Sequence, residues 1–455
     1  MAQGRTWRNR LLIILALSVY ALLVAAEIAP NPLPALWNWL DRERPLAPDL
    51  VWQHRLGAKP DLVVEAGRQL AVDLGRGVEV RRGSTGNLAY ALEDAAWVAV
   101  AGYGDDTVVV VRDGDGYQVR DANRGRVLRR EEDADAVWTY QDAVLDLRCE
   151  RRDSCGLRRF APGSDEPVWS VDLPGAGQAS GANPPLAGGQ LDFPSGIHPG
   201  VSSPGPIPQL IGFAVDRGRL VVVDTVTGRL LREWEAPREE QLSVIGGRVI
   251  SSSAIRRDGI CVVSVTGYDA VTGLPAWGPH PYHLRTASGS GCEHRNRPRA
   301  AGAAMIAVDP DGREMVISAY DGRVLWAGTA DDRVVALSTE YAVVRTADPT
   351  VVVGISLRDG GRMWEQTAHE DAEFALGDCG VLVIDHRPDR LRVWDLATGE
   401  ERLSVRTTAR AMACTADGLV IADGRSVGLA AWPGADTGDS PQRADRDVDA
   451  PEVRK

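Results

Sequence analysis

Three histidines and one cysteine lie within a short stretch of the sequence and are of residue types that ligate zinc. They are His280, His283, Cys292 and His294, in the spacing H-x2-H-x8-C-x-H. Imidazole and thiolate are common zinc ligands, but this spacing matches no standard zinc finger. A cysteine oxidised in a disulfide cannot act as a thiolate ligand. We therefore interpret this stretch as a loop held by a disulfide rather than as a metal site.

Two acidic turns have the opening residues of a calcium loop. They are Asp113-Gly-Asp115-Gly and Asp309-Pro-Asp311-Gly. Both lack the later carboxylates that such a loop needs, so we interpret them as hairpin turns. The sequence also contains no glycine-rich phosphate loop and no G-x-S-x-G nucleophile elbow. From these patterns we predict no catalytic, cofactor-binding or metal-ligating residue, and no bound cofactor.

The N-terminal residues predict a membrane segment. The apolar run LLIILALSVYALLVAA follows Arg5, Arg8 and Arg10, and with residues 27–29 it is just long enough to span a hydrocarbon core of about 30 Å. Positive charge stays on the cytoplasmic side. We therefore predict a cytoplasmic basic segment at residues 1–10 and a signal anchor at 11–29. The protein would cross the cytoplasmic membrane once, with the rest of the chain outside. A signal peptide cleaved after Val24 and Ala26 is the alternative.

All the cysteines follow this segment, in the part of the chain that we place outside. They are Cys149, Cys155, Cys261, Cys292, Cys379 and Cys414. An even number of cysteines in an oxidising compartment indicates disulfides before metal ligands. The simplest pairing joins nearest neighbours. It would close a hairpin between the first two cysteines and tie down a Gly- and Pro-rich excursion between the next two.

The overall charge excludes one class of partner. The chain has 63 acidic and 51 basic residues and a net charge of -12. No basic stripe follows the first ten residues, and affinity for phosphate backbones depends on clustered positive charge. We therefore expect no nucleic-acid partner. With 44% hydrophobic and 25% charged residues, the chain has the composition of a folded protein.

From about residue 60, short runs of Val, Ile and Leu alternate with Gly, Asp and Pro clusters, which indicates many β-strands. One phrase recurs: a strand ending in Asp, a turn closing on Gly, then a short strand that often carries Trp. Its members are Asp121, Gly125, Trp169, Asp224, Gly228, Trp234, Asp269, Gly273, Trp277, Asp321, Gly322, Trp326, Gly361, Trp364, Asp395 and Gly399. A period of about 40 residues with four strands per unit is typical of a β-propeller.

Each residue of the phrase has a local structural reason. Asp caps the turn by accepting bonds from backbone N–H groups, and Gly adopts the positive φ that the hairpin needs. The following Trp or Leu would fill the space between neighbouring blades. We therefore assign these residues a structural role.

The phrase D-x-x-T-G-x-x-x-W, as at Asp269 to Trp277, resembles the repeat of the quinoprotein-like, or PQQ-like, β-propellers. The resemblance implies an all-β ring of seven or eight blades over residues 49–432. Eight copies of the phrase, counting a weak one at Asp73, favour eight blades. Such rings often close by pairing strands from the two chain ends. Residues 51–56 would then complete a blade formed by residues 409–432.

Four further segments flank or interrupt the repeat. Residues 30–48 have the composition of a juxtamembrane linker, and residues 433–455 that of a disordered tail. Residues 174–208 are rich in Gly, Pro and Ser, so we predict an exposed inserted loop. A second insertion covers residues 278–302. Loops on one face of a propeller commonly carry its binding function.

The family that the repeat resembles contains both quinone-dependent dehydrogenases and non-enzymatic scaffolds. The enzymes share an adjacent pair of cysteines, a calcium site of Glu, Asn and Asp, and a catalytic Asp. This chain has no adjacent cysteine pair. The resemblance therefore implies a non-catalytic platform that binds an unknown protein or cell-envelope component. A quinone- or metal-dependent oxidoreductase and a small-ligand sensor are the alternatives.

Overall fold

The computed structural model describes residues 45–151, 154–174, 194–215, 219–237, 239–288 and 292–434. The chain divides into two compact units, Met1–Pro45 and Leu46–Lys455, and nearly all described residues belong to the second. The predicted anchor at 11–29, most of the predicted linker and the tail from residue 435 lie outside the described residues. No helix in the described part of the chain is long and apolar enough to cross a membrane.

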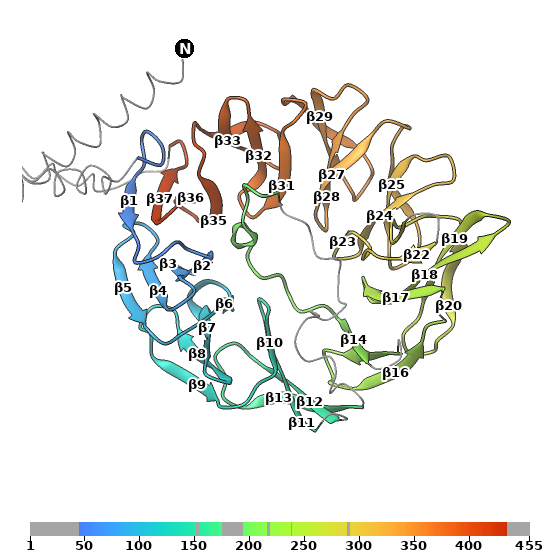
Figure 1. The fold of residues 1–455 in the computed structure, drawn as a ribbon, viewed down its shortest axis with the longest axis horizontal. Coiled ribbons are helices and arrows are strands. Elements are labelled where there is room, and N and C mark those ends of the chain that lie inside the picture. Colours follow the sequence, from blue (N-terminus) through green and yellow to red (C-terminus); the bar gives the residue numbers. More distant parts are fainter. Residues whose placement is uncertain are drawn as a thin grey trace, which may run out of the picture. The chain divides into compact units, whose positions relative to one another are not determined.

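The second unit is a ring of antiparallel sheets, which we number as blades 1 to 9 in chain order (Figure 1). The first strand of each four-stranded blade lies nearest the centre of the ring. Blades 1 to 3 are β2 (Leu62–Ala66), β3 (Gln69–Asp73), β4 (Val78–Arg82) and β5 (Leu88–Leu92); β6 (Val98–Ala101), β7 (Val108–Asp113), β8 (Gly116–Asp121) and β9 (Val127–Glu131); and β10 (Ala136–Thr139), β11 (Val144–Arg151), β12 (Ser154–Phe160) and β13 (Pro167–Pro174).

Blades 4 to 6 are β14 (Leu210–Val215), β15 (Arg219–Asp224) and β16 (Leu230–Glu235); β17 (Glu240–Ile245), β18 (Arg248–Arg257), β19 (Ile260–Tyr268) and β20 (Pro275–His280); and β23 (Ala300–Ala301), β24 (Ala304–Val308), β25 (Glu314–Ser318) and β26 (Val324–Ala327). A separate two-stranded hairpin, β21 (Ala287–Ser288) and β22 (Glu293–His294), lies within the second insertion.

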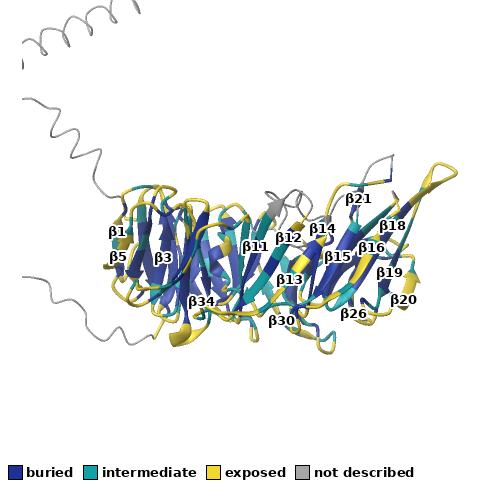
Figure 2. Ribbon diagram, turned by 90° about the horizontal axis from the view of Figure 1, so that it is seen from below, coloured by how far each residue is buried: buried dark blue, intermediate teal, exposed yellow. Residues whose placement is uncertain are grey.

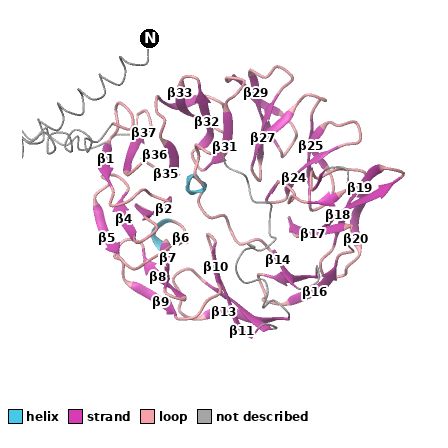
Figure 3. Ribbon diagram, in the orientation of Figure 1, coloured by secondary structure: helices cyan, strands magenta, loops and turns pink. Residues whose placement is uncertain are grey.

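Blades 7 to 9 are β27 (Arg333–Leu337), β28 (Tyr341–Arg345), β29 (Val351–Ser356) and β30 (Arg362–Thr367); β31 (Glu373–Gly377), β32 (Gly380–His386), β33 (Asp389–Trp394) and β34 (Glu401–Val405); and β35 (Arg410–Cys414), β36 (Gly418–Asp423), β37 (Ser426–Ala431) and β1 (Trp52–Arg55). Two short 3-10 turns, η1 (Gly104–Asp106) and η3 (Pro199–Val201), are the described helical elements (Figure 3).

The ring closes as predicted, because β1 from the start of the unit pairs with β37 at its end. The antiparallel register runs from Trp52 opposite Leu429 to Arg55 opposite Ser426. The Trp52 indole also donates a hydrogen bond to the carbonyl of Gly83, 3.0 Å away in blade 1. The closing strand therefore joins the two chain ends and contacts the neighbouring blade.

The all-β propeller is confirmed, but the predicted count of eight blades, with seven as the alternative, is wrong. The described residues form nine blades. Each copy of the repeat phrase except the weak one at Asp73 marks a turn between the third and fourth strands of a blade. Blade 9 has no such turn, because its fourth strand comes from the other end of the chain. Counting phrases therefore omits the closing blade.

The weak copy at Asp73 was also misplaced. Asp73 ends β3, the second strand of blade 1, and the turn before the fourth strand closes where Gly86 N–H donates to the carbonyl of Arg82. In blade 7 the glycine with positive φ is Gly360, at 71°, and not the predicted Gly361. Both errors arise because these turns depart from the D-x-x-T-G pattern.

The outer strands of the blades are less buried than the strands inside them (Figure 2). In blade 2, four consecutive valines of β7 are buried, whereas β13 and β16 at the rim have mostly exposed or half-exposed residues. Strands covered on both faces favour continuous aliphatic runs, and rim strands tolerate polar side chains. The hydrophobic core therefore lies between neighbouring blades, in a separate cluster at each boundary.

The turns of the repeat phrase also contact the neighbouring blades. The Asp269 carboxylate accepts bonds from Thr272 N–H at 2.8 Å and Val271 N–H at 3.1 Å, and these bonds lower the pKa of that carboxyl. The indole of Trp277 donates to the carbonyl of Ala319 at 2.9 Å, at the turn of the next blade. A Cβ on Gly322 of that turn would overlap the Trp277 ring. The turns at Gly228 and Gly399 pack in the same way on Trp169 and Trp364, whereas the turn at Gly125 packs on Tyr90.

The same contact recurs at other blade boundaries. Trp169 donates to Thr225 at 2.8 Å, and Trp364 donates to Leu396 at 2.9 Å. The indole N–H of Trp234 has no hydrogen-bond partner, and its ring packs with Tyr268. The copy at Trp234 therefore keeps the packing of the phrase without its hydrogen bond.

Candidate functional site

The first insertion, predicted as an exposed loop, is partly buried inside the ring. We call its residues 194–209 the strap; residues 175–193 lie outside the described part of the chain. The strap crosses the middle of the ring and ends at β14 (Figure 1). Ile197 and Val201 are 2% and 0% exposed, so the prediction of an exposed loop is wrong for these residues. The Gly- and Pro-rich composition predicted exposure to solvent, but the apolar side chains of Ile197 and Val201 allow the strap to pack inside the ring.

A cavity of about 820 Å³ lies beside the end of the strap. Its walls are the turns between the first and second strands of blades 1, 2, 3, 8 and 9, together with Arg402 of β34, Trp432 after β37 and strap residues 203–205. In an antiparallel meander these turns lie at one end of every blade. We call this end of the ring the cavity face.

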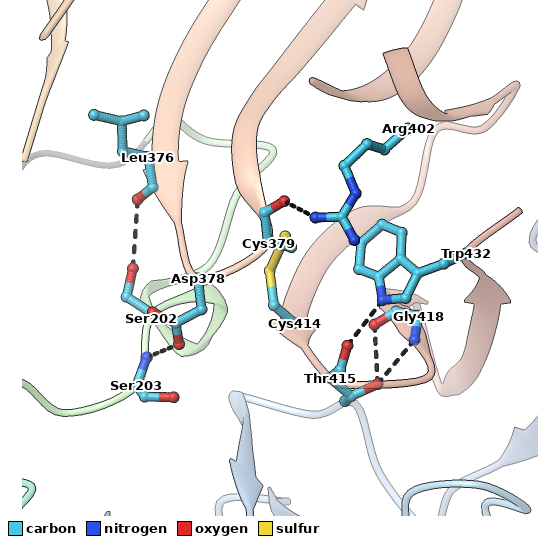
Figure 4. Close-up of a disulfide and its surroundings, with 10 residues drawn as sticks. All are labelled: Ser202, Ser203, Leu376, Asp378, Cys379, Arg402, Cys414, Thr415, Gly418 and Trp432. Atoms are coloured by element: carbon cyan, nitrogen blue, oxygen red, sulfur yellow. Dashed lines mark hydrogen bonds between the residues drawn. A yellow bond between two sulfur atoms is a disulfide. The ribbon is translucent and has the colours of Figure 1, made fainter. Parts of the chain in front are cut away.

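A disulfide forms one wall of the cavity by joining two blades. Cys379, in the turn after β31, is bonded to Cys414 at the end of β35 (Figure 4). Arg402 donates to the carbonyl of Cys379 at 3.1 Å, and its guanidinium lies 4.9 Å from the centre of the Trp432 ring. The Trp432 indole in turn donates to the carbonyl of Thr415 at 3.0 Å. Blades 8 and 9 are therefore held together at the cavity by covalent, polar and ring contacts.

The strap is fixed to the same wall. Asp378 donates its backbone N–H to the carbonyl of Val201 at 3.0 Å and accepts a bond from Ser203 N–H through its carboxylate (Figure 4). On the other side, Gln141 N–H donates to the carbonyl of Gly205 at 2.8 Å. These bonds hold the strap between blade 8 and blade 3, so residues 203–205 are an ordered part of the cavity wall.

Glu65 is the most strongly perturbed acid in the cavity. Burial raises the pKa of this carboxyl to about 7, although a hydrogen bond from Ala416 N–H opposes the change. The negative charges of Asp378 and Asp417 raise the pKa further. A half-buried carboxyl near two others holds its proton to near-neutral pH, so the charge of the cavity changes in the physiological range.

The rim of the cavity carries exposed aromatic and charged side chains. Tyr103, beside η1, is 77% exposed, the highest value among the large apolar or aromatic side chains of the described residues. Arg68 and Asp105 also lie at the cavity and are exposed. An exposed aromatic ring with charged neighbours around a concave surface is typical of a binding site. The geometry suits recognition of a partner or ligand.

The histidines predicted as weak metal candidates are each bonded to the protein. His283 contacts the carbonyl of Ala287 at 3.1 Å, and His294 contacts Thr286 and the carbonyl of Glu239, both at 3.1 Å. His280 stacks between the rings of Trp277 and Tyr282. Cys292 is bonded to Cys261. Over the described ranges, no group of three or more His, Cys, Asp or Glu side chains is arranged to hold a metal.

The cysteines follow the nearest-neighbour pairing. Cys149 is bonded to Cys155 within the β11–β12 hairpin, and the two remaining pairs are Cys261–Cys292 and Cys379–Cys414. The second pair ties the β18–β19 hairpin to the second insertion, and only the third reaches the cavity.

Sequence reasoning missed the cavity residues Glu65, Tyr103, Asp378, Arg402 and Trp432. The repeat residues that it selected lie in the turns between the third and fourth strands, nearer the rim of the ring. The signal that could have found the cavity is the position just after each first strand, where Asp378 and Thr415 stand. That position has no recurring residue type, so the repeat phrase does not mark it.

Comparisons with known proteins agree with the propeller assignment. Residues 153–352 match the model of a protein family described as outer membrane protein assembly factor BamB. No curated protein matches the sequence.

Solved structures with similar folds are distant in sequence. BamB from Moraxella catarrhalis is 16% identical, with 78% of this chain and 96% of that chain covered and a TM-score of 0.34. The computationally designed Ika8 protein is 14% identical, with 85% and 99% covered and a TM-score of 0.38. Sqt1 from Saccharomyces cerevisiae is 9% identical, with 84% and 98% covered and a TM-score of 0.37. Scores this low support no argument about function.

The repeat phrase, the ring of four-stranded blades and the family match lead to the same assignment. The chain is a β-propeller, and residues 153–352 of it match a family of PQQ-like repeat propellers.

Proposed function

We propose that this protein is a non-catalytic binding platform and that its cavity face receives a protein partner. The observation that carries the proposal is the cavity of about 820 Å³, built by turns of five blades and the strap. A rigid concave surface with an exposed aromatic rim loses little entropy when it binds. The family match supports the same role, because the description of that family names an assembly factor.

The proposed location is the outer side of the cytoplasmic membrane, with residues 11–29 as the anchor. Three arginines precede the apolar run and favour a cytoplasmic N-terminus. The three disulfides support an oxidising compartment for the propeller. The partner would then be a protein or another component of the cell envelope.

A second candidate function is recognition of a small ligand, as in a sensor. The cavity volume falls within the range of about 300–1,000 Å³ that is typical of small-molecule sites. Such a ligand would contact Glu65 and Arg402 rather than the exposed rim. An oxidoreductase is the third possibility from the sequence, and dye reduction by the isolated propeller with pyrroloquinoline quinone and calcium tests it. We expect no reduction.

The platform is tested by crosslinking tagged full-length protein in cells, followed by membrane extraction, capture and mass spectrometry. We expect a reproducible protein partner. Truncating an aromatic residue at the centre of an interface costs at least about 2 kcal/mol, so Tyr103→Ala should reduce recovery about 30-fold. Tyr320→Ala is the matched control, because Tyr320 is 56% exposed and lies in blade 6, away from the cavity.

Recovery of the protein alone from wild type, together with a rise in melting temperature when small envelope metabolites are added, would favour the ligand-binding function. Equal loss of partner in Tyr103→Ala and Tyr320→Ala would show that binding does not depend on the cavity.

A further inference from the structure

Blade 4 lacks the first strand that every other blade has. Its turn at Asp224–Gly228 identifies β15 and β16 as the third and fourth strands, so β14 is the second. Within the described ranges, no strand pairs with the inner edge of β14. The chain that precedes β14 is the strap, which lies against blades on the opposite side of the ring (Figures 1 and 3).

The strap adds a short parallel strand to the inner edge of blade 9. Ile197 pairs in parallel with Ala411 of β35. His198 N–H donates to the carbonyl of Ala411 at 2.7 Å, and Ala411 N–H donates to the carbonyl of Gly196 at 3.0 Å. The Arg410 side chain also donates to the carbonyl of Ser195 at 2.8 Å. These main-chain bonds are those by which a sheet edge binds an extended peptide.

Shape as well as hydrogen bonding selects the segment that binds there. Gly200 packs against the carbonyl oxygens of Val63 in β2 and Met412 in β35, where a Cβ would overlap both atoms. A Cβ on Gly196 would overlap the side chain of Ile384 in blade 8. The inner strands of blades 9 and 1 therefore form a groove that requires glycine at Gly200 and holds a buried aliphatic side chain at Ile197.

We propose that this groove is a peptide-binding site, occupied in cis by the strap, and that it takes an extended peptide of a protein partner with the same Gly-aliphatic-x-Pro-Gly chemistry. This inference rests on the proposed platform function and names the kind of segment that the partner supplies. The strap is tied to the ring at both ends, so its effective concentration is high, on the order of millimolar. The partner peptide binds when the strap leaves the groove.

The test uses a fluorescent peptide with the sequence of residues 194–205, PSGIHPGVSSPG, and fluorescence anisotropy. Intact wild type should bind it at least about 100-fold more weakly than the variant Ile197→Asp, whose carboxylate disfavours the buried position of the strap. A matched control peptide carries Ala in place of Gly200 and should not bind the variant.

A second protein removes the risk that Ile197→Asp fails to fold. A protease site inserted between residues 185 and 186 of otherwise wild-type protein is cut after folding, which frees one end of the strap. The cut protein should bind the wild-type peptide and not the control peptide. The inference is overturned when the folded cut protein binds neither peptide, or binds both equally. Partner capture that still depends on Tyr103 would then leave the platform function intact.

Discussion

At the scale of single residues, Glu65 makes the stability of the propeller depend on pH. Its pKa of about 7 in the folded protein lies above the ordinary 4.5, so the folded state binds the proton more tightly than the unfolded state. Stability is therefore lost as the pH rises from about 4.5 to about 7. Relative to Glu65→Gln, wild type should lose about 1–2 kcal/mol of unfolding free energy between pH 5 and pH 8, allowing for solvent screening of a half-exposed group.

Urea unfolding at pH 5, 6, 7 and 8 measures this difference. Asp269→Asn provides a contrast of opposite sign, because the Thr272 N–H bond lowers the pKa of Asp269 below its ordinary 3.8 and any effect on stability appears in acid. A gap between wild type and Glu65→Gln that is the same at every pH would contradict the assignment of a raised pKa.

The residues that sequence alone could predict are those whose role is local. Asp269, Thr272 and Gly273 form a turn within five consecutive residues, so their types follow from the backbone that they cap. Glu65 and Asp378 are more than three hundred residues apart in sequence and become neighbours only when the ring closes. Neither segment alone contains a pattern that predicts the proximity of these two carboxyl groups.

At the scale of elements, the disulfide between blades should stabilise the ring more than the disulfide within one hairpin. Cys379–Cys414 closes a loop of 35 residues and Cys149–Cys155 one of 6. Chain-entropy arguments then give about 4 kcal/mol for the first and about 2 kcal/mol for the second. Denaturant unfolding of Cys379→Ser/Cys414→Ser and of Cys149→Ser/Cys155→Ser measures both. A larger loss from the hairpin pair would contradict this role for the blade 8–blade 9 bond.

Removal of the closing strand β1 should lower the stability of the propeller, because β1 is the fourth strand of blade 9. A protein that begins at residue 57 lacks β1 and the buried Trp52, whereas one that begins at residue 46 keeps both. Loss of a buried tryptophan costs about 3–5 kcal/mol, so the melting temperature of the shorter protein should be lower by on the order of 5 °C. The exposed edge of β37 should also promote self-association. Equal melting temperatures and equal monomer fractions by light scattering would count against ring closure by β1.

Sequence reasoning predicted the closing strand but not the strap, for physical reasons. Residues 51–56 form a strand-like segment without a neighbouring partner, and β37 supplies that partner at the other chain end. The strap has no aliphatic run, and the backbone carbonyls of Val63 and Met412 exclude a Cβ at Gly200. A solvent-exposed loop and a tightly packed extended segment can therefore have the same amino-acid composition, and the composition did not distinguish them here.

At the scale of the whole molecule, the ring has two ends that should differ in function. The cavity, strap residues 203–205 and the disulfide between blades 8 and 9 all lie at the cavity face. The β18–β19 hairpin turns at the opposite end, where Ile260 is 69% exposed. Both ends present accessible side chains, so exposure alone does not distinguish the working surface.

Binding at the cavity face is tested most directly by position-resolved photocrosslinking in cells, with a photoreactive amino acid at Tyr103 or at Ile260 of the full-length protein. We expect a discrete crosslinked partner from position 103, weakened by Arg68→Glu, and none from position 260. The same partner crosslinked only from position 260, or equally from both, would contradict the claim that the cavity face is where this propeller binds.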